Sequence, residues 1–412
     1  MKIKRLLAFA TACLFSMSLL TGCAKESGSS DSGTSSELNV PEFDFDDTPT
    51  IDYVSDVNDS IDTTMTAIEF VKGIKVGWNL GNTLDATGNS GLYTETSWGN
   101  PAATEELFLA VKEAGFNAVR IPTTWEKHMD DEYNIDGDWM KRVTQVVDYA
   151  YKNDMYVILN MHHESWNYPY EDNKAAAAEI MTKAWTQIAE NFSGYGERLI
   201  FEGMNEPRWV GTDWEWSGGN EEGRSVVNYL GQVFVDAVRA TGGNNAQRFL
   251  MVPDYAANSG ESALADWVCP NDPANRVILS VHAYTPYSFA LQEKGSGKWL
   301  AERPNCTREI DALAEVLDRL FLSKGIAVII GETGAMNRYI TDDEGNSVTN
   351  ENYRAEWSEY FTSTFHKLGI PCFFWDNAAF VSGETFGIFD RRTYECKYPD
   401  YVAGAVKGAE SE

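Results

Sequence analysis

The segment SKGIAVIIGET, residues 323–333, contains the pattern that decides the fold of this chain. Lys324 and Gly325 are typical of a helix end, because a cation is favoured in the last turn and glycine readily adopts the conformation that stops a helix. Residues 327–330 form an apolar run without alternation, which is typical of a strand buried on both faces of a parallel sheet. Glu332 follows this run closely. The segment therefore predicts a helix, a buried parallel strand and a polar strand end, in that order.

The same order recurs along the chain. Residues 105–114 place their apolar side chains on one helical stripe and are followed by Gly115, just before another apolar run. The chain has eight such runs, rich in Val, Ile and aromatic residues: 74–80, 118–122, 156–161, 199–204, 249–252, 277–281, 327–330 and 372–375. Eight buried strands with helices between them predict an α/β fold, a (β/α)8 TIM barrel, and 412 residues suffice for one with long loops. The alternative, an open doubly wound sheet, has less support because no GxGxxG turn follows the first run.

The N-terminus has the features of a targeting segment. A short basic region is followed by a mostly apolar stretch, residues 6–20, and then by Thr21-Gly22-Cys23. We interpret residues 1–22 as a secretory signal peptide. It resembles a bacterial lipoprotein signal, in which Cys23 would carry lipid and hold a secreted protein on a membrane surface. The alternative is an ordinary signal peptide with an incidental cysteine.

The rest of the chain is expected to form two parts. Residues 23–62 are rich in Ser, Gly and acidic residues, which predicts a flexible tether or, from residue 38, a loose strap over the domain. Residues 63–412 are predicted to be a single catalytic domain. Export permits disulfides, and sequence leaves open the three full pairings of Cys269, Cys306, Cys372 and Cys396. No spacing of Cys or His indicates a zinc site.

Composition excludes some partners and favours others. The net charge is −29, and a nucleic-acid partner is therefore not expected, since phosphates require a basic surface. The acidic surface also disfavours polyanionic polysaccharides. Aromatic residues make up 13% of the chain, including 13 Trp. Aromatic side chains beyond the needs of the core favour a surface that stacks on sugar rings.

Two glutamates stand out among the polar residues that end the apolar runs. In a barrel the active site forms at these C-terminal strand ends, and Glu206 follows the fourth run while Glu332 follows the seventh. A retaining glycosidase uses two carboxyl groups about 5–5.5 Å apart, one as nucleophile and the other as acid and then base. Side chains from both strands can point at a shared centre. The alternative is that each glutamate only pairs with a nearby arginine.

Several motifs, in the right order, resemble glycoside hydrolase family 5. FEGMNEP (201–207) resembles its acid/base motif and IGETG (330–334) its nucleophile motif. NAVRIP (117–122) and VHAYTPY (281–287) resemble its second and sixth strands. GWNLGNTLDA (77–86), followed by ETSWGNP (95–101), looks like the endoglucanase and xyloglucanase branch of that family. The resemblance extends from about residue 68 to residue 398.

The resemblance implies roles for the matched residues. Glu206 would be the acid/base and Glu332 the nucleophile. Arg120 would lie near Glu332 and keep it ionised, and Tyr284 would orient it. Asn205 would hydrogen-bond the sugar 2-hydroxyl, a contact that strengthens in the transition state.

Further residues are implied as supporting or substrate contacts. His162, in preference to His163, and His282 would bind sugar hydroxyls and tune the carboxyl pair. Trp375 would form the floor under the sugar next to the cut. Additional candidate contacts are Trp209, Trp98 and Asn79. For each tryptophan the alternative is plain packing in the core or in a loop.

The expected function is that of a retaining endo-β-1,4-glucanase acting on cellulose-like, mixed-linkage or xyloglucan chains, without a cofactor and as a monomer. The same fold and residues would also serve a β-mannanase or another β-glycanase. A different class would be a surface lipoprotein that binds glycan without cutting it. A metal-dependent barrel hydrolase using His162 and His163 is a third alternative.

Overall fold

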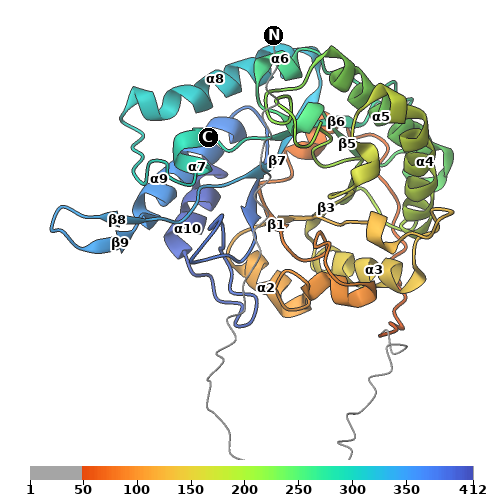
Figure 1. Ribbon diagram of the computed structural model, residues 1–412, viewed down its shortest axis with the longest axis horizontal. Coiled ribbons are helices and arrows are strands. Elements are labelled where there is room, and N and C mark those ends of the chain that lie inside the picture. The colour runs from red at the N-terminus through yellow and green to blue at the C-terminus, as the bar shows by residue number, and fades with distance from the viewer. Residues whose placement is uncertain (1–48, 412) are drawn as a thin grey trace, which may run out of the picture. The chain divides into compact units, whose positions relative to one another are not determined.

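All eight predicted runs form strands that pair in parallel and close into a barrel in the order β1-β10-β7-β6-β5-β4-β3-β2 (Figure 1). The computed structural model describes residues 49–411. The barrel strands are β1 (Val76–Leu80), β2 (Ala118–Ile121), β3 (Tyr156–Asn160), β4 (Leu199–Glu202), β5 (Leu250–Pro253), β6 (Val277–His282), β7 (Ala327–Thr333) and β10 (Cys372–Asp376). The predicted (β/α)8 barrel is thus confirmed, with strand boundaries that differ by one to three residues.

Helices form an outer ring around the strands (Figure 1). They are α1 (Ala67–Val71), α2 (Glu105–Glu113), α3 (Gly137–Tyr151), α4 (Lys174–Asn191), α5 (Glu221–Ala240), α6 (Glu261–Leu264), α7 (Tyr287–Ala290), α8 (Pro304–Leu320), α9 (Glu351–His366) and α10 (Pro399–Gly408). The α2 helix buries the stripe predicted from sequence, Leu107, Phe108 and Val111. It ends before Gly115, whose positive φ of 107° is a conformation that glycine adopts without strain.

The inside of the barrel has two layers of different chemistry. Near the amino ends of the strands lies an apolar cluster that includes Ile158, Ile200 and Ile278. Helix α1 closes this end of the barrel with Phe70 and Val71, which belong to the same cluster. Two residues further along three of the strands, the buried side chains are polar: Asn160 on β3, Glu202 on β4 and Ser280 on β6. Because alternate residues of a strand face the same side, each strand supplies both layers. The polar layer lies at the carboxyl edge.

One element was not predicted from sequence. Strands β8 (Tyr339–Thr341) and β9 (Ser347–Thr349) form an antiparallel hairpin that projects from the barrel beside α9 and α10 (Figure 1). Its strands are short and mostly exposed, so they lack the apolar runs that identified the barrel strands. Arg338 anchors the start of the hairpin through hydrogen bonds to the backbone oxygens of Phe289 and Gln292.

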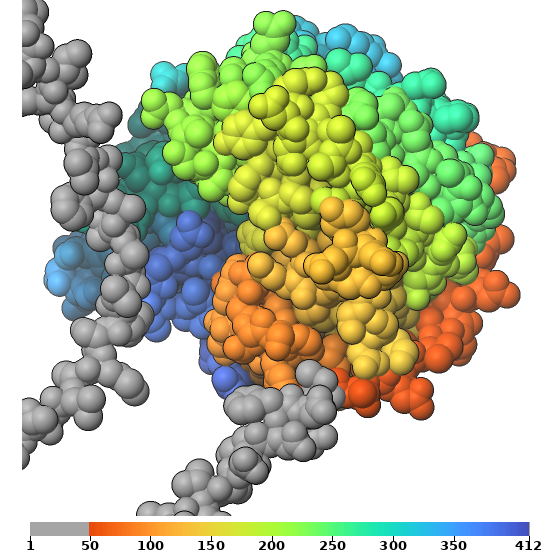
Figure 2. All heavy atoms as spheres, turned by 45° about the vertical axis from the view of Figure 1, so that its right-hand side comes forward, coloured from red at the N-terminus to blue at the C-terminus, as the bar shows by residue number. Residues whose placement is uncertain are grey.

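Residues 49–62 lie on the barrel as a strap, which is one of the two forms that the sequence analysis offered for this stretch. Tyr53 donates to Asp148 at 2.6 Å, and Arg276 donates to the backbone oxygen of Asp62 at 2.7 Å. These first described residues, coloured red to orange, lie against the surface in Figure 2. Hydrogen bonds fasten this strap together with the half-buried apolar side chains of Ile51, Val57 and Ile61, of which Val57 packs against the core.

The remaining expectations for the N-terminus, the signal peptide at residues 1–22, Cys23 and the tether up to residue 48, lie outside the described residues. Within residues 49–411, no helix is both long enough and apolar enough to span a bilayer. The four cysteines in this part of the chain are unpaired, and Cys372 is buried in β10.

Candidate active site

The carboxyl edge of the barrel opens into a cavity of about 1160 Å³. Both predicted glutamates line it, together with residues that the sequence analysis named: Trp98, His162, Asn205, His282, Tyr284 and Trp375. The loops that follow β4, β5 and β6 complete the wall on one side, with Trp216, Asn258 and Tyr287 among their residues. The structure therefore brings most of the predicted site into one space.

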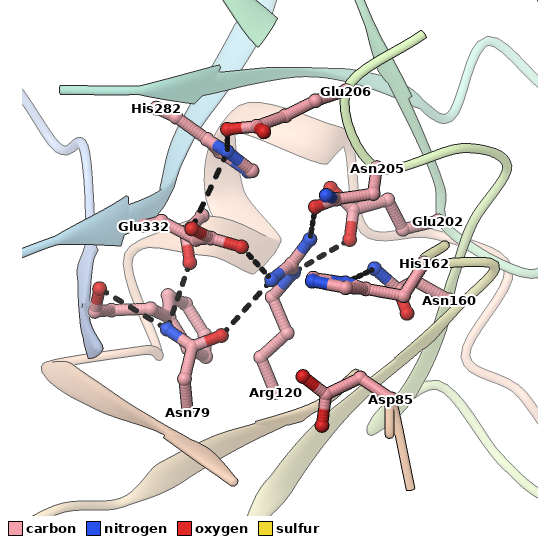
Figure 3. Close-up of polar contacts among 12 residues, drawn as sticks. Asn79, Asp85, Arg120, Asn160, His162, Glu202, Asn205, Glu206, His282 and Glu332 are labelled. Carbon is pink, nitrogen blue, oxygen red and sulfur yellow. Dashed lines mark hydrogen bonds and ion pairs between the residues drawn. The ribbon is translucent and has the colours of Figure 1, made fainter. Parts of the chain in front are cut away.

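Arg120 is the centre of the hydrogen-bond network under this cavity (Figure 3). Its Nε donates to Glu202 at 2.6 Å, and its Nη1 donates to Glu332 at 2.7 Å. Nη1 also donates to Asn79 at 3.0 Å, and Nη2 donates to Asn205 at 2.7 Å. Burial disfavours the charged guanidinium, but the two glutamates outweigh burial and raise the pKa of Arg120 above its usual value. The arginine is therefore a permanent buried cation.

Glu202 was not predicted as a site residue. It is fully buried, ends β4 inside an apolar run, and accepts from Ser280 at 2.7 Å as well as from Arg120. Its ion pair with Arg120 means that the guanidinium is shared between two carboxylates, Glu202 and Glu332. A charged residue two positions after the inward-facing Ile200 was the signal for this role, because that spacing places it on the inside of the barrel.

Glu332, near the end of β7, is held by two donors. Arg120 donates to one carboxylate oxygen, and the hydroxyl of Tyr284 donates to the other at 3.0 Å. Burial, with the negative charges of Glu332 and Glu206, raises the pKa of Tyr284 well above its usual value. Tyr284 therefore stays protonated and keeps donating. The two contacts, one to each carboxylate oxygen, fix the direction of the Glu332 side chain.

Glu206 has a different environment, since its close partner is a histidine. Nδ1 of His282 lies 2.7 Å from Oε1 of Glu206 and 3.7 Å from Oε2 of Glu332. Burial alone would raise the pKa of Glu206, but His282, Arg208 and Arg120 outweigh it and lower the pKa. The two carboxylates likewise raise the pKa of His282 against the effect of burial. Glu206 and His282 thus share a proton, which lies preferentially on the histidine.

The separation of the two glutamates is short. One carboxylate oxygen of Glu206, one of Glu332 and a ring nitrogen of His282 all lie within 4.8 Å of one another. A carboxyl pair at this separation leaves no room for a water molecule between the acid and an attacking carboxylate, in contrast to the wider spacing of inverting sites. The arrangement can deliver a nucleophile and a proton to the same bond.

The hydrogen bonds around His162 determine which ring nitrogen carries its proton. Oδ1 of Asn160 accepts the backbone N–H of Thr123 at 3.0 Å, so the amide nitrogen of Asn160 must face Nδ1 of His162, 3.1 Å away. Burial and nearby positive charges lower the pKa of His162 well below its usual value. The ring is therefore neutral, accepts at Nδ1 and carries its proton on Nε2. His162 is also parallel to Trp375, with ring centroids 5.8 Å apart.

Two of the residues proposed as substrate contacts, Asn79 and Trp209, do not line the cavity. Asn79 is fully buried, because Arg120 and the backbone oxygens of Gly331 and Phe373 occupy its amide. Trp209 does not line the cavity: it stacks on Tyr170 at 4.8 Å, and its indole N–H donates to the backbone oxygen of Pro169 at 2.7 Å. Asn79 instead supports Arg120, and Trp209 packs within the loops beside the cavity.

Other tryptophans near strand ends divide between core and rim. Trp78, Trp125 and Trp299 are buried in the core, so for them the packing alternative holds. Trp98 remains 42% exposed at the rim, where its ring lies against His163. Trp216, a tryptophan after a strand end that was not among the preferred contacts, is 57% exposed and also lines the cavity.

Two clusters among the described residues bring together groups that metals bind. Glu206, His282 and Glu332 form one, and Asp85 forms the other with His162 and His163. In the first cluster, His282 already contacts Glu206, and Glu332 already accepts hydrogen bonds from Arg120 and Tyr284. In the second, Asp85 accepts the backbone N–H groups of Asn82 and Thr83, and burial raises its pKa to about 7. Both clusters suit hydrogen bonding and proton transfer.

Comparisons with known proteins agree with this geometry. A family model described as "Cellulase (glycosyl hydrolase family 5)" matches residues 84–381. "Endoglucanase B" of Ruminococcus albus is 39% identical over 433 residues, which covers 100% of this chain and 98% of the relative. The solved structure of a "GH5-4 broad specificity endoglucanase from Ruminococcus champanellensis with bound cellotriose" is similar at 42% identity and a TM-score of 0.78, covering 86% of this chain and 100% of that one. A xyloglucan-specific endo-β-1,4-glucanase from a metagenomic library, in complex with cellotriose, is 40% identical at a TM-score of 0.76, covering 82% and 98%.

Proposed function

The chain belongs to glycosyl hydrolase family 5, and on that premise we propose that its site cuts internal β-1,4-glucosidic bonds by a retaining, double-displacement mechanism. The protein is a glycoside hydrolase of the endoglucanase kind. The observation that carries the mechanism is the separation of at most 4.8 Å between a carboxylate oxygen of Glu206 and one of Glu332. Retaining enzymes use such close pairs, whereas inverting enzymes need about 6.5–9.5 Å.

In the first step Glu332 attacks the anomeric carbon while Glu206 protonates the departing glycosidic oxygen. Arg120 and Tyr284 hold Glu332 as an oriented anion, and both hydrogen bonds precede the reaction, so little reorganisation is needed. The proton that Glu206 delivers comes from the pair it forms with His282. The carbon–oxygen bond breaks, the leaving sugar gains the proton, and a glycosyl ester forms on Glu332.

In the second step Glu206 acts as the base. It takes a proton from an incoming water molecule, whose oxygen attacks the anomeric carbon and releases Glu332. The shared proton has left with the first sugar, so His282 is neutral at this stage, and the positive charge of Arg208 favours the ionised form of Glu206 that this step requires. The same carboxyl group serves both steps because its proton is shared with His282 rather than held by a single group.

Sugar binding next to the cut is assigned to three side chains. Oδ1 of Asn205 accepts from Arg120, which leaves the amide N–H groups of Asn205 for the sugar 2-hydroxyl. His162 presents Nε2–H, because its Nδ1 faces Asn160. Trp375 lines the cavity beside them and offers an apolar face to the sugar ring.

The proposed substrates are cellulose-like, mixed-linkage and xyloglucan chains. Support comes from the large open cavity and from relatives whose names include broad-specificity and xyloglucan-specific endoglucanases. Exposed Trp98 and Trp216 extend the aromatic surface beyond the central sugar, which suits a chain bound on both sides of the cut. A β-mannanase is the second candidate, because the residues that cut the bond are the same in that reading.

Lipidation at Cys23, and with it attachment of the secreted enzyme to a membrane surface, is also a proposal. It is supported by the basic and apolar pattern of residues 1–22 and the Leu20-Thr21-Gly22-Cys23 sequence. Expression of the full chain with and without Cys23→Ser, followed by membrane fractionation, tests it. Membrane association that persists in the variant would exclude lipid at Cys23 as the anchor. Light scattering of the purified domain tests whether the enzyme is a monomer.

The central experiment measures reducing ends released by residues 49–412 from soluble cellulose, mixed-linkage glucan, xyloglucan and mannan. Glu332→Gln is the matched control, since it keeps the size of the side chain and removes the nucleophile. We expect cleavage of the three glucans by the native protein and retention of configuration at the new reducing end, measured by NMR. Cleavage of mannan alone would overturn the substrate class, and binding without cleavage by the native protein would favour a glycan-binding function.

A further inference from the structure

Arg208 connects the acid/base glutamate to an exposed tryptophan at the rim of the cavity. Its Nη1 donates to the backbone oxygen of Glu206 at 2.9 Å and lies 3.5 Å from Oε2 of the same residue. Its guanidinium carbon lies 4.0 Å from the ring centroid of Trp216, a cation–π geometry. One side chain thus contacts both the proton donor and a part of the aromatic surface proposed to bind the substrate chain beyond the central sugar.

Glu215 fixes the position of this arginine. It accepts from Nε of Arg208 at 3.3 Å, and its other oxygen accepts the backbone N–H of Gly211 at 2.8 Å. The side chains of Arg208 and Glu215 are each 21% exposed, so water screens their charges only in part. The loop that follows β4 therefore holds the guanidinium in one place between Glu206 and Trp216.

Trp216 lies on the side of the cavity away from Trp375. It belongs to the loop after β4, and the order of strands places three strands between β4 and β10 in either direction around the barrel. Trp375, at the end of β10, is assigned to the sugar that becomes attached to Glu332. Since Glu206 lies near the base of the Trp216 loop, Trp216 faces the part of the substrate that leaves. Its exposed face is available for a sugar, because the guanidinium covers the other.

We propose that Arg208 is a positioning residue that couples a leaving-group sugar stacked on Trp216 to proton transfer by Glu206. The inference rests on the proposed function and adds a residue to it. A sugar on Trp216 excludes water from the guanidinium, and a less hydrated charge acts more strongly on the carboxyl group beside it. The coupling therefore operates only when the substrate extends past the cut.

Several other groups act on Glu206, and the test must separate them from Arg208. The charged or titratable residues that face it from the surrounding elements are His282, Glu332, Arg120, His163, Tyr284, Glu384 and Arg208 itself. Of these, Arg208 is the one that also contacts Trp216. A change at Arg208 that depends on Trp216 is therefore the signature of the proposed coupling.

The experiment compares two substrates in the native enzyme, Arg208→Met, Arg208→Lys, Trp216→Ala and the double variant Arg208→Met/Trp216→Ala. Cellohexaose has sugars on both sides of the cut and needs its leaving group protonated. The 2,4-dinitrophenyl β-cellobioside has no leaving-group sugar, and its phenolate leaves without a proton. We expect Arg208→Met to lower kcat/KM on cellohexaose about tenfold and to change the value for the aryl glycoside less than about twofold.

Two measurements, the pH profile and the double variant, distinguish coupling through Arg208 from a purely structural role of this residue. Removing the positive charge raises the pKa of Glu206, so the alkaline limb of kcat/KM on cellohexaose should move up by about half a pH unit in Arg208→Met but not in Arg208→Lys. In the Trp216→Ala background the effect of Arg208→Met should shrink to about twofold, because the shared interaction is already lost. Thermal unfolding of each variant checks that the fold is intact.

Two results would overturn the inference. Equal loss on both substrates without a shift of the pH limb would mean that Arg208 only supports the loop. Additive losses in the double variant would mean that the arginine and Trp216 act independently. Failure of the native enzyme to cleave either substrate would instead contradict the proposed function, so the two failures are distinguishable.

Discussion

The two layers inside the barrel are made by the same strands but have opposite chemistry. On β4, Ile200 faces the apolar layer and Glu202, two residues later, faces the polar layer. On β3 the corresponding residues are Ile158 and Asn160. The comparison teaches that a barrel strand can serve stability at one end and reactivity at the other without any change of backbone geometry.

The energetics of the layers differ accordingly. The apolar layer is stabilised by removing side chains from water, about 25 cal/mol for each Å² of apolar surface, and includes Phe70 stacked on Phe249 with ring centroids 3.8 Å apart. The polar layer buries Arg120, Glu202 and Glu332, and the desolvation of such charges offsets much of their attraction. We therefore expect changes in the apolar layer to alter stability and changes in the polar layer to alter activity.

The largest expected effect is at the nucleophile. Glu332→Gln should lower kcat on soluble cellulose by at least about four orders of magnitude, because no other group can form the glycosyl ester. Stability should change little, since Arg120 keeps its ion pair with Glu202. Initial rates and urea unfolding of the same preparations check both statements. Residual activity above one per cent, with contamination excluded, would show that another carboxylate is the nucleophile.

The next largest effect should come from Arg120, the cation that pairs with both Glu202 and Glu332 in the polar layer. Arg120→Met leaves Glu202 and Glu332 buried without their counter-charge, which should lower the free energy of unfolding by about 3–5 kcal/mol and abolish activity. Urea unfolding measures the loss. The double variant Arg120→Met/Glu202→Gln should regain part of the stability but none of the activity. If the single variant were as stable as the native protein, the polar layer would not depend on charge pairing.

A comparison of two buried histidines sharpens the same point. His282 lies between carboxylates, which raise its pKa, whereas His128 is buried outside the barrel and stacked on Trp139 at 3.7 Å. Burial lowers the pKa of His128 from 6.5 to about 4. The unfolded chain therefore binds this proton more readily, and stability should be lost as pH falls from about 6.5 to about 4, by about 3 kcal/mol in total.

The variant His128→Phe isolates this contribution, because phenylalanine can keep the stack on Trp139 without titrating. In urea unfolding from pH 7 to pH 4, the native protein should lose about 3 kcal/mol more stability than the variant, because the variant has no imidazole to protonate on unfolding. Any cost of the substitution at pH 7 shifts the whole curve of the variant and does not change this difference in slope. Parallel curves would contradict burial of an uncharged His128.

Sequence predicted the barrel and most of the cavity wall because both leave a local signal. A helix stop followed by an apolar run identifies a strand. A polar residue at the end of that run lies at the carboxyl edge of the barrel, independently of the conformation of the loops. Glu202 was missed because it lies inside an apolar run, where only the alternation with Ile200 reveals its direction. Trp209 and Trp216 belong to one loop, and local sequence could not show that the first would stack on Tyr170 and the second would stay exposed.

The smallest expected effect tests the two layers at neighbouring inward positions of one strand. Ile200→Val removes one buried methyl group, which should lower the free energy of unfolding by about 1 kcal/mol and leave kcat/KM within about twofold of the native value. Glu202→Gln keeps the size of its side chain but removes the charge that balances Arg120, so the cation acts fully on Glu332 and weakens it as a nucleophile. We expect at least about a tenfold lower kcat for that variant. Urea unfolding and initial rates on mixed-linkage glucan measure both variants. If Ile200→Val lowered kcat as much as Glu202→Gln, the division between a stabilising layer and a reactive layer would be wrong, because the apolar layer would then be setting the geometry of the site.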